Sequence, residues 1–310
     1  MRALVTGAGG FVGRYLVDHL LEQGDEVLGI TRSRSGTPLA CKTEYFDIGD
    51  LDACRQAISA YKPDAIYHLA GMAFVPEAEE DFEKALKVNV LGTSNIYRVT
   101  HLLERPTRIL LISSSEVYGK IKPAQLPINE KTQIAPANNY SLSKAMAELV
   151  STRYSDSASL TNVIIRPFNH IGPGQNARFV VSNFARQLAL IKLNKAPAKI
   201  SVGNLEARRD FTDVRDIVRA YRLAAVSGRG LYNFASGKSI SIRSILDLLI
   251  MVSGIKVDVK PDPTRIRASD TPELFADISK AKAELGWEPE FEIRNTLEDI
   301  FKYWVEQEGK

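Results

Sequence analysis

A phenol and an ammonium group lie four residues apart in the segment NYSLSK, as Tyr140 and Lys144. In a helix, residues at this spacing share one face, so the two side chains can meet. An ammonium beside a phenol lowers the pKa of the phenol from about 10 toward neutrality, so the hydroxyl can exchange a proton with a carbonyl or carbinol oxygen. An isolated pair of this kind is more often part of a solvent-facing helix. The neighbouring sequence therefore has to indicate whether this pair is reactive.

The context is the segment SSSEVYG, which follows an apolar run and precedes the Tyr140 helix. The end of a buried strand is where a parallel sheet binds its ligands. Ser114 is therefore expected to donate a hydrogen bond to the same substrate oxygen as Tyr140. Glu116 lies two residues further on, on the same side if the segment is extended, and can serve as an additional acid or base. A surface role for Glu116 is an equal alternative.

Three glycines, Gly7, Gly10 and Gly13, follow the first apolar run and open an amphipathic stretch. One glycine allows the tight turn, one lets backbone N–H groups reach a pyrophosphate, and one lets the helix pack on the strand. The N-terminus of the helix adds partial positive charge. Arg14 and Tyr15 stand where a Walker A loop requires Lys and Ser or Thr. The pattern predicts a dinucleotide site, and the alternative is a plain glycine-rich turn.

The end of the second predicted strand indicates which dinucleotide binds. A site selective for NAD(H) usually has Asp or Glu about 20 residues after the glycines. This chain has Thr31-Arg32-Ser33-Arg34 there, with no carboxylate. Arg32, helped by Ser33 or Arg34, can hold a ribose 2′-phosphate, which favours NADP(H) and leaves NAD(H) as a second option. A solvated basic loop is the alternative.

Strands rich in Val, Ile and Leu alternate with helical patterns through the first half of the chain. Strands are expected at residues 3–5, 26–32, 65–71, 108–114 and 161–169, and helices at 15–24, 51–64, 82–104 and 140–155. This alternation predicts an α/β fold with a Rossmann-type doubly wound parallel sheet.

Beyond Arg166 the alternation loosens, which predicts a smaller, interleaved C-terminal substrate domain. We expect residues 1–166 plus 211–237 to form the dinucleotide-binding domain and residues 167–210 plus 238–310 to form the substrate domain.

Composition excludes several classes of protein. The chain has 310 residues, 45% hydrophobic and 25% charged, so a large core can form and disorder is excluded. A net charge of +3, with basic residues spread along the chain, argues against nucleic acid as a partner. No apolar run approaches the roughly 18 residues of a membrane span, and the start does not resemble a signal peptide, so we expect a cytoplasmic protein. Cys41 and Cys54 have no metal-ligand spacing, and no metal site is predicted.

Taken together, the motifs GAGGFVG, HLAG and SSSEVYG with the Tyr140–Lys144 pair resemble the extended short-chain dehydrogenase/reductase family over essentially the whole chain. The resemblance implies further cofactor-binding residues, namely Phe11, Val12, Asp47, Ile48, Leu69, Ala70, Gly71 and Asn89. Asp47 and Ile48 would flank the adenine, and Leu69 to Gly71 would line the cofactor path. Tyr140 and Lys144 would also contact the cofactor, Lys144 through the nicotinamide ribose. His68 is expected to be a packed strand-end histidine without a chemical role.

Two later segments, RPFNHIGPGQ and VGNLEARRDFTDVRD, resemble the GDP-sugar branch of this family, which contains dehydratases and the reductases that act on their 4-keto product. The substrate-binding residues implied are Asn169, Phe179, Val180, Asn204, Leu205, Ala207, Arg209, Arg267 and Asp270. Arg209 and Arg267 would bind a diphosphate in forked geometry, and Asp270 the ribose hydroxyls. Ala268 replaces a usual proline, and Asp270 is one carbon shorter than the usual glutamate. A surface salt-bridge network is the alternative for the arginines.

The resemblance implies NADPH-dependent reduction of the C4 ketone of GDP-4-dehydro-6-deoxy-D-mannose to GDP-D-rhamnose or its C4 epimer. The segment RPFNHIGPGQ favours this reductase, whereas Glu116 favours a dehydratase. A dehydratase or epimerase with tightly bound NAD(P) is the alternative, and a non-catalytic dinucleotide-sensing or scaffold protein is a third hypothesis. The helices from Phe82 and around Tyr140 look like those that form a homodimer contact in this family, but their apolar faces could also cover the sheet.

Overall fold

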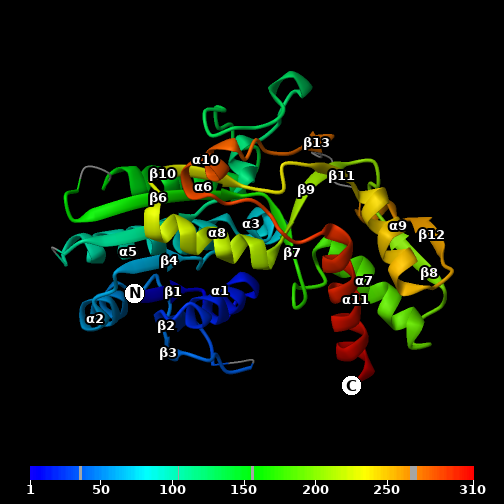
Figure 1. Cartoon of the computed structure of the whole chain (residues 1–310), viewed down its shortest axis with the longest axis horizontal. Coiled ribbons are helices and arrows are strands. Elements are labelled where there is room, and N and C mark those ends of the chain that lie inside the picture. The colour runs from blue at the N-terminus through cyan, green and yellow to red at the C-terminus, as the bar shows by residue number, and fades with distance from the viewer. Residues whose placement is uncertain (35–36, 104, 155–156, 266–270) are drawn as a thin grey trace.

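The computed structural model describes residues 1–34, 37–103, 105–154, 157–265 and 271–310. Within these residues, a seven-stranded parallel sheet has the order β10-β6-β5-β4-β1-β2-β3 (Figure 1). Its strands are β1 (Arg2–Thr6), β2 (Glu26–Thr31), β3 (Lys42–Tyr45), β4 (Ala65–His68), β5 (Thr107–Ile112), β6 (Leu160–Pro167) and β10 (Gly230–Phe234). The chain moves outward from β1 in one direction and then in the other, so a crevice opens between the carboxyl ends of β1 and β4.

Helices cover both faces of this sheet because successive strand residues point to opposite sides. Val5 packs in a core with α1 (Phe11–Glu22) and α8 (Val214–Ser227), whereas its neighbour Leu4 packs in a second core with α2 (Leu51–Tyr61), α5 (Gly92–His101) and α6 (Asn139–Thr152). Both faces of each central strand are therefore apolar, which explains why these strands are uninterrupted apolar runs in the sequence. The predicted α/β fold with a Rossmann-type doubly wound sheet is confirmed.

The helix expected at 82–104 is divided. The structure has α4 (Phe82–Leu86), then a π-helical turn (Lys87–Leu91), then α5. The π turn contains Asn89, whose side chain is buried and points back to the segment after β4. A π turn inserts a residue into the helix and is frequent at functional sites, whereas the apolar periodicity alone shows one continuous helix.

The second half of the chain forms a smaller assembly around its own core (Figure 1). Its helices are α7 (Val180–Lys192), α9 (Ile242–Ser253) and α11 (Ile293–Gly309). In one small sheet β9 (Arg208–Asp213) pairs with β7 (Asn169–Ile171), β11 (Ser239–Ser241) and β13 (Glu273–Leu274), and in another β8 (Lys199–Val202) pairs with β12 (Asp258–Pro261). The two short helices α3 (Val75–Glu80) and α10 (Ser279–Leu285) complete the elements used below.

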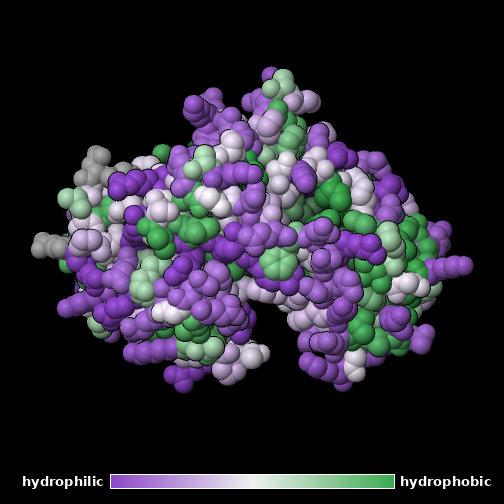
Figure 2. Space-filling view, in the orientation of Figure 1, coloured by the Kyte–Doolittle hydropathy of each residue, from purple (hydrophilic) through white to green (hydrophobic). Residues whose placement is uncertain are grey.

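The division into two domains remains our proposal. It is supported by the separate cores and by α8 and β10, which return to the main sheet after the chain has entered the smaller assembly. The proposed boundary at residue 211 falls within β9. Figure 2 shows the molecule hollowed between the lobe with β2 and β3 and the lobe with α7 and α11. None of the helices in the described part of the chain is both long and apolar enough to cross a membrane. A cytoplasmic location stays a prediction.

Candidate functional site

A cavity of about 1300 Å³ lies along the carboxyl ends of the sheet strands, with β2 and α1 on one side and the start of α7 on the other. Most of the predicted site residues line it. These are Gly7, Gly10, Phe11, Val12, Gly13, Arg32, Asp47, Ile48, Leu69, Ala70, Gly71, Ser114, Glu116, Tyr140, Lys144, Asn169, Phe179, Val180, Asn204, Ala207 and Arg209. Tertiary folding thus brings together residues from nine separate segments of the sequence.

The glycine turn is shaped for a close approach of the backbone. A Cβ atom on Gly13 would lie 2.2 Å from the carbonyl oxygen of Gly7, and Gly7 itself has a φ of 71°. The helix α1 then starts after Gly10 with no side-chain cap and no acidic residue in its first turn. Its first N–H groups are therefore free of side-chain acceptors and suited to a pyrophosphate. The residues present fit a dinucleotide cofactor.

The part of the cavity wall that follows β2 and β3 contains Arg32, Asp47 and Ile48. Arg32 is exposed, directly after β2, and no ion pair with another described residue occupies its guanidinium. The Asp47 carboxylate accepts a hydrogen bond from the backbone N–H of Gly49 at 2.8 Å, which fixes its orientation. Ile48 is buried and packs against Gly92, where a Cβ atom would come within 2.5 Å of its side chain. A cation, a carboxylate of fixed orientation and a packed apolar side chain thus line the same cavity.

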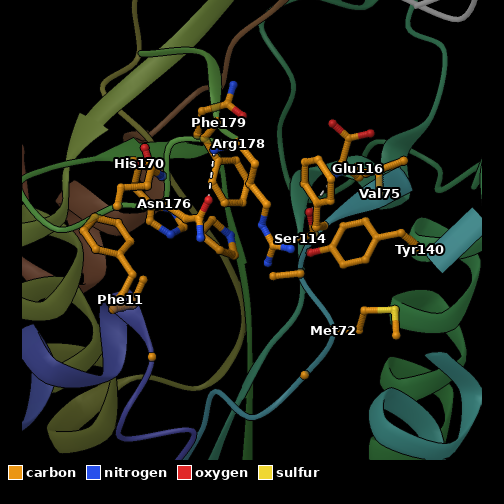
Figure 3. Close-up of a pocket in the computed structure, with 18 of the residues that line it drawn as sticks. Phe11, Met72, Val75, Ser114, Glu116, Tyr140, His170, Asn176, Arg178 and Phe179 are labelled. Carbon is orange, nitrogen blue, oxygen red and sulfur yellow. Dashed lines mark hydrogen bonds between the residues drawn. The ribbon is translucent and has the colours of Figure 1, made fainter. Parts of the chain in front are cut away.

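The predicted reactive residues converge on the same cavity from β5 and α6 (Figure 3). Tyr140 is 7% exposed, and its hydroxyl points to the side chain of Ser114 (Figure 3). Lys144, one helical turn further on, donates from Nζ to the backbone oxygen of Ile112 at 2.5 Å. The helix α6 is capped by Asn138, whose side chain accepts a hydrogen bond from the N–H of Ser141. This cap places Tyr140 in the first turn, at the edge of the cavity.

The electrostatics of the pair differ from the sequence-based expectation. Burial raises the pKa of Tyr140 to about 12, and the nearby Glu116 carboxylate acts in the same direction. The neighbouring Ser114 hydroxyl lowers the pKa of Tyr140 and so opposes this increase without cancelling it. Burial also lowers the pKa of Lys144 to about 8, although the Glu148 carboxylate counteracts this. The predicted acidification of the phenol by Lys144 is wrong for this structure, because desolvation dominates and the ammonium is engaged by Ile112.

Glu116 lines the cavity and is half-buried, so the structure places it at the candidate site and not on the open surface. The segment is not extended as expected. Residues Ser115–Tyr118 form a 3-10 turn in which the Ser114 hydroxyl accepts a hydrogen bond from the Glu116 N–H at 3.2 Å. Figure 3 shows Glu116, Ser114 and Tyr140 on the same side of the cavity.

Two predicted contacts are not made at the cavity. Asn89 lies behind the wall, where its side chain accepts from the N–H of Met72 at 2.8 Å and donates to Ser143 at 2.8 Å. Both ends of this amide are used to tie the segment after β4 to α6, so Asn89 supports the cavity without lining it. Leu205 is buried in the core of the smaller assembly, because its apolar side chain packs among α7, α9 and α11. Two others, Arg267 and Asp270, lie outside the described residues.

His68 behaves as expected for a packed strand-end histidine. Its two ring nitrogens are hydrogen-bonded with the hydroxyls of Thr6 and Thr93, at 2.8 and 2.9 Å. Burial, with a smaller contribution from Lys144, lowers the pKa of His68 to about 3, so the ring is neutral near pH 7.

The substrate side of the cavity is built by the smaller assembly. Asn169 lies on β7, Phe179 and Val180 at the start of α7, and Arg209 on β9. Arg209 donates from Nη1 to the backbone oxygen of Thr271 at 2.7 Å, which holds its guanidinium at the wall. Neighbouring Asn204 and Ala207 also line the cavity.

Sequence reasoning missed a cluster in which Arg178 and Phe179, both labelled in Figure 3, contact residues that follow β4. The Arg178 guanidinium lies 4.5 Å from the centre of the Phe74 ring, and its Nη1 is 3.3 Å from the Glu77 carboxylate. The rings of Phe74 and Phe179 pack edge to face at 5.7 Å. Phe11 and His170 stack nearby, with centroids 6.3 Å apart. These partners are distant in sequence and carry no periodic signal, so only folding reveals the contact.

A family model described as GDP-mannose 4,6 dehydratase matches residues 4–300. A GDP-6-deoxy-D-mannose reductase of Pseudomonas aeruginosa is 33% identical, over 98% of this chain and 97% of its own length. A GDP-6-deoxy-D-talose 4-dehydrogenase of Aggregatibacter actinomycetemcomitans is 31% identical, over 97% of each chain.

Two solved structures superimpose on nearly all of this chain. The structure of RMD from Pseudomonas aeruginosa complexed with NADPH is 31% identical with a TM-score of 0.88, covering 99% of this chain and 100% of its own. A UDP-glucose 4-epimerase of Thermus thermophilus in complex with NAD is 26% identical, also with a TM-score of 0.88, covering 98% and 99%.

Proposed function

The chain belongs to the GDP-mannose 4,6-dehydratase family, and from this premise we propose that it uses NADPH to reduce the C4 ketone of GDP-4-dehydro-6-deoxy-D-mannose to GDP-D-rhamnose or its C4 epimer. One observation carries the proposal. Ser114, Tyr140 and Lys144 face the cavity into which the uncapped glycine turn also opens. The relatives named as a reductase and a 4-dehydrogenase of GDP-6-deoxy sugars support oxidation or reduction at C4.

The enzyme class predicted from the sequence, an NAD(P)-dependent oxidoreductase, is confirmed by these relatives. The predicted cofactor, NADP(H) with NAD(H) as a second option, is confirmed at family level, because related structures were solved with NADPH and with NAD. The N–H groups of Phe11, Val12 and Gly13 would hold the pyrophosphate, and Arg32 the 2′-phosphate. When bound, NADPH supplies the hydride.

Tyr140 is the proposed proton donor. With a pKa of about 12 it stays protonated at neutral pH, so the hydroxyl can deliver a proton as negative charge develops on the ketone oxygen. The Ser114 hydroxyl would donate a hydrogen bond to the same oxygen. Lys144, protonated below a pKa of about 8, would stabilise the phenolate left after the transfer. The three side chains together would favour the transition state over the ground state.

The substrate is proposed to be a GDP-linked 4-keto-6-deoxy sugar. Arg209 would bind the diphosphate, and Asn169, Phe179, Val180, Asn204 and Ala207 would surround the nucleotide sugar. Leu205 would support this wall from the core, and Asn89 would support the cofactor side. Roles for Arg267 as a diphosphate ligand and Asp270 as a ribose ligand belong to the same proposal.

The decisive experiment incubates purified protein with NADPH and the 4-keto GDP-sugar and follows the absorbance of reduced nicotinamide. Stoichiometric loss of NADPH with appearance of the 6-deoxy sugar supports the proposal. NADH in a parallel reaction measures the cofactor preference. Product without any change in absorbance would contradict net reduction, and NMR of the product defines the configuration at C4.

A second candidate is a dehydratase or epimerase that oxidises C4 transiently and returns the hydride to the product. The observation that favours it is the Glu116 carboxylate inside the cavity, because a dehydratase needs an acid or base at the sugar carbon next to the ring oxygen. Incubation with GDP-mannose and catalytic NADP⁺ tests it. Conversion to the 4-keto sugar supports this candidate, and no conversion favours the reductase.

We also propose a homodimer through α6 and the neighbouring π turn. Leu142 and Leu149 lie seven residues apart on one face of α6 and are 41% and 65% exposed, and Leu91 from the π turn is 58% exposed. Large apolar side chains gathered on one exposed face are typical of an interface. A second copy of this chain would cover them.

A further inference from the structure

Three consecutive residues at the end of β5 are each tied to a different turn of α6. The backbone oxygen of Ile112 accepts the hydrogen bond from Lys144, and the side chain of Ser114 lies beside the hydroxyl of Tyr140 (Figure 3). Between them, the Ser113 hydroxyl donates to the carboxylate of Glu148. Tyr140, Lys144 and Glu148 are four residues apart in succession, so they form one row on the helix. The first two are reactive residues of the proposed mechanism, and the third has no role in it.

Glu148 is also held from β6. Arg166 on β6 donates to its two carboxylate oxygens from Nε and Nη2, at 2.9 and 2.7 Å. The two side chains are only 8% and 7% exposed. The Arg166 guanidinium in turn lies over the ring of Tyr118 at 4.8 Å, and the Tyr118 hydroxyl donates to Asn233 at 2.8 Å. A buried carboxylate that accepts this many hydrogen bonds is held in one orientation. The Ser113 hydroxyl that donates to it is therefore also held in place.

We propose that Glu148 is a positioning residue: through Ser113 it fixes α6 along the end of β5, so that Tyr140 and Lys144 stay in register with Ser114. This inference rests on the proposed function, because it assigns Glu148 a role toward that reaction. Glu148 does not line the cavity and touches neither substrate nor cofactor in the proposal. A shift of about 1 Å between a proton donor and the reacting oxygen can reduce turnover by about a hundredfold.

The alternative is that Glu148 and Arg166 form an ion pair that only stabilises the fold. A matched control distinguishes the two. Ser151 lies on the same helix, is fully buried, and its hydroxyl accepts from Asn162 of β6 at 3.0 Å and donates to the backbone oxygen of Glu148. Ser151→Ala therefore removes a helix-to-sheet hydrogen bond without touching the Ser113–Glu148 contact.

Ser113→Ala breaks the contact while leaving the Glu148–Arg166 pair intact, and Glu148→Asp keeps the charge but shortens the reach. We expect both to lower kcat by at least about tenfold, with the KM for NADPH and for the GDP-sugar within about twofold of wild type. Ser151→Ala should lose a similar amount of thermal stability and keep kcat within about twofold. Equal kcat values in Ser113→Ala, Glu148→Asp and Ser151→Ala would overturn the proposal.

The pH dependence of kcat is a second test, because a purely structural role of Glu148 would not change it. The charged or titratable groups around Lys144 are Tyr140 and Glu148 on its own helix, His68 from β4 and Arg166 from β6. Glu148 is the nearby anion that favours the ammonium. In Glu148→Gln the alkaline fall in kcat should move to lower pH, whereas in Ser113→Ala it should stay in place. A folded Glu148→Gln protein with an unmoved profile and unchanged kcat would contradict the proposal.

Glu148→Gln leaves Arg166 without a full counter-charge and can fail to fold, in which case Ser113→Ala and Glu148→Asp decide. The outcome for Tyr140→Phe separates this inference from the proposed function. Wild-type turnover in Tyr140→Phe would overturn the proposed chemistry itself. Loss of turnover in Tyr140→Phe, with normal turnover in Ser113→Ala and Glu148→Asp, would overturn only the positioning role.

Discussion

Tyr140 and Lys144 lie one helical turn apart, yet the ammonium of Lys144 is hydrogen-bonded to the backbone of Ile112 while the phenol of Tyr140 points to the Ser114 side chain (Figure 3). Burial moves their pKa values apart, down to about 8 for the lysine and up to about 12 for the tyrosine. At neutral pH the tyrosine is therefore a protonated acid and the lysine a cation. This charge state suits the reduction of a ketone, which consumes a proton.

Tyr140→Phe removes the proposed proton donor and keeps the ring. Turnover with NADPH and the GDP-sugar should fall by about two to four powers of ten, because general acid catalysis is lost. Binding of NADPH, measured by fluorescence titration, should change little. Turnover at the wild-type level would contradict the role assigned to Tyr140.

The rate should depend on pH through Lys144. Its pKa is lowered to about 8 by burial, so the ammonium is present below that pH and is lost as pH rises through it. We expect kcat to decline above about pH 8, while Tyr140, with a pKa near 12, remains protonated over the same range. Lys144→Met should have low turnover without the decline. The range from about pH 7 to about pH 9.5 extends about one unit or more on each side of the pKa of Lys144. A constant kcat over this range would contradict the prediction.

Arg32→Ala tests the choice of cofactor. Removal of the guanidinium should weaken NADPH binding by about tenfold to a hundredfold and leave NADH binding nearly unchanged, because only NADPH carries the 2′-phosphate. Arg55→Ala is the matched control, since Arg55 on α2 is paired with Asp52 at 2.7 Å and does not line the cavity. An equal loss of affinity for NADPH and NADH would show that Arg32 does not bind the 2′-phosphate.

Gly13→Ala tests the glycine turn. The added Cβ would lie 2.2 Å from the backbone oxygen of Gly7, a clash that only a shift of the turn can relieve. We expect the affinity for NADPH to fall by at least about tenfold and the protein to lose stability. Gly309→Ala, where a Cβ atom meets nothing within 4 Å, should behave as wild type in calorimetric titration.

Leu149→Glu tests the proposed homodimer. A carboxylate in the centre of an apolar interface would remain without a partner, so the dimer should dissociate at concentrations where the wild-type protein is dimeric. Met251→Glu on α9, where Met251 is 60% exposed, is the control for a charge added elsewhere. Sedimentation velocity measures the outcome, and a wild-type protein that is monomeric would refute the proposal.

Local patterns in the sequence were sufficient for the fold class and for most of the site. The glycine spacing, the apolar strands and the Tyr140–Lys144 pair depend on interactions within a few residues, and the structure places them at one cavity. The short edge strand β3 was not recognised, because KTEY is polar and half-exposed and carries no apolar alternation. Asn89 was identified as important, but its position in a π turn behind the wall could not be read from periodicity.

The sequence by itself determined which groups are available for chemistry and which strands and helices carry them, because secondary structure follows from local periodicity and turn residues. Only the tertiary structure decided their charge states and partners. The pKa of Tyr140 is raised and not lowered because burial removes solvent from the phenol, and burial depends on the whole fold. The Arg178–Phe74 contact and the Ser113–Glu148 tie join residues distant in the chain, so their existence depends on the packing of the two walls and of α6 on β5.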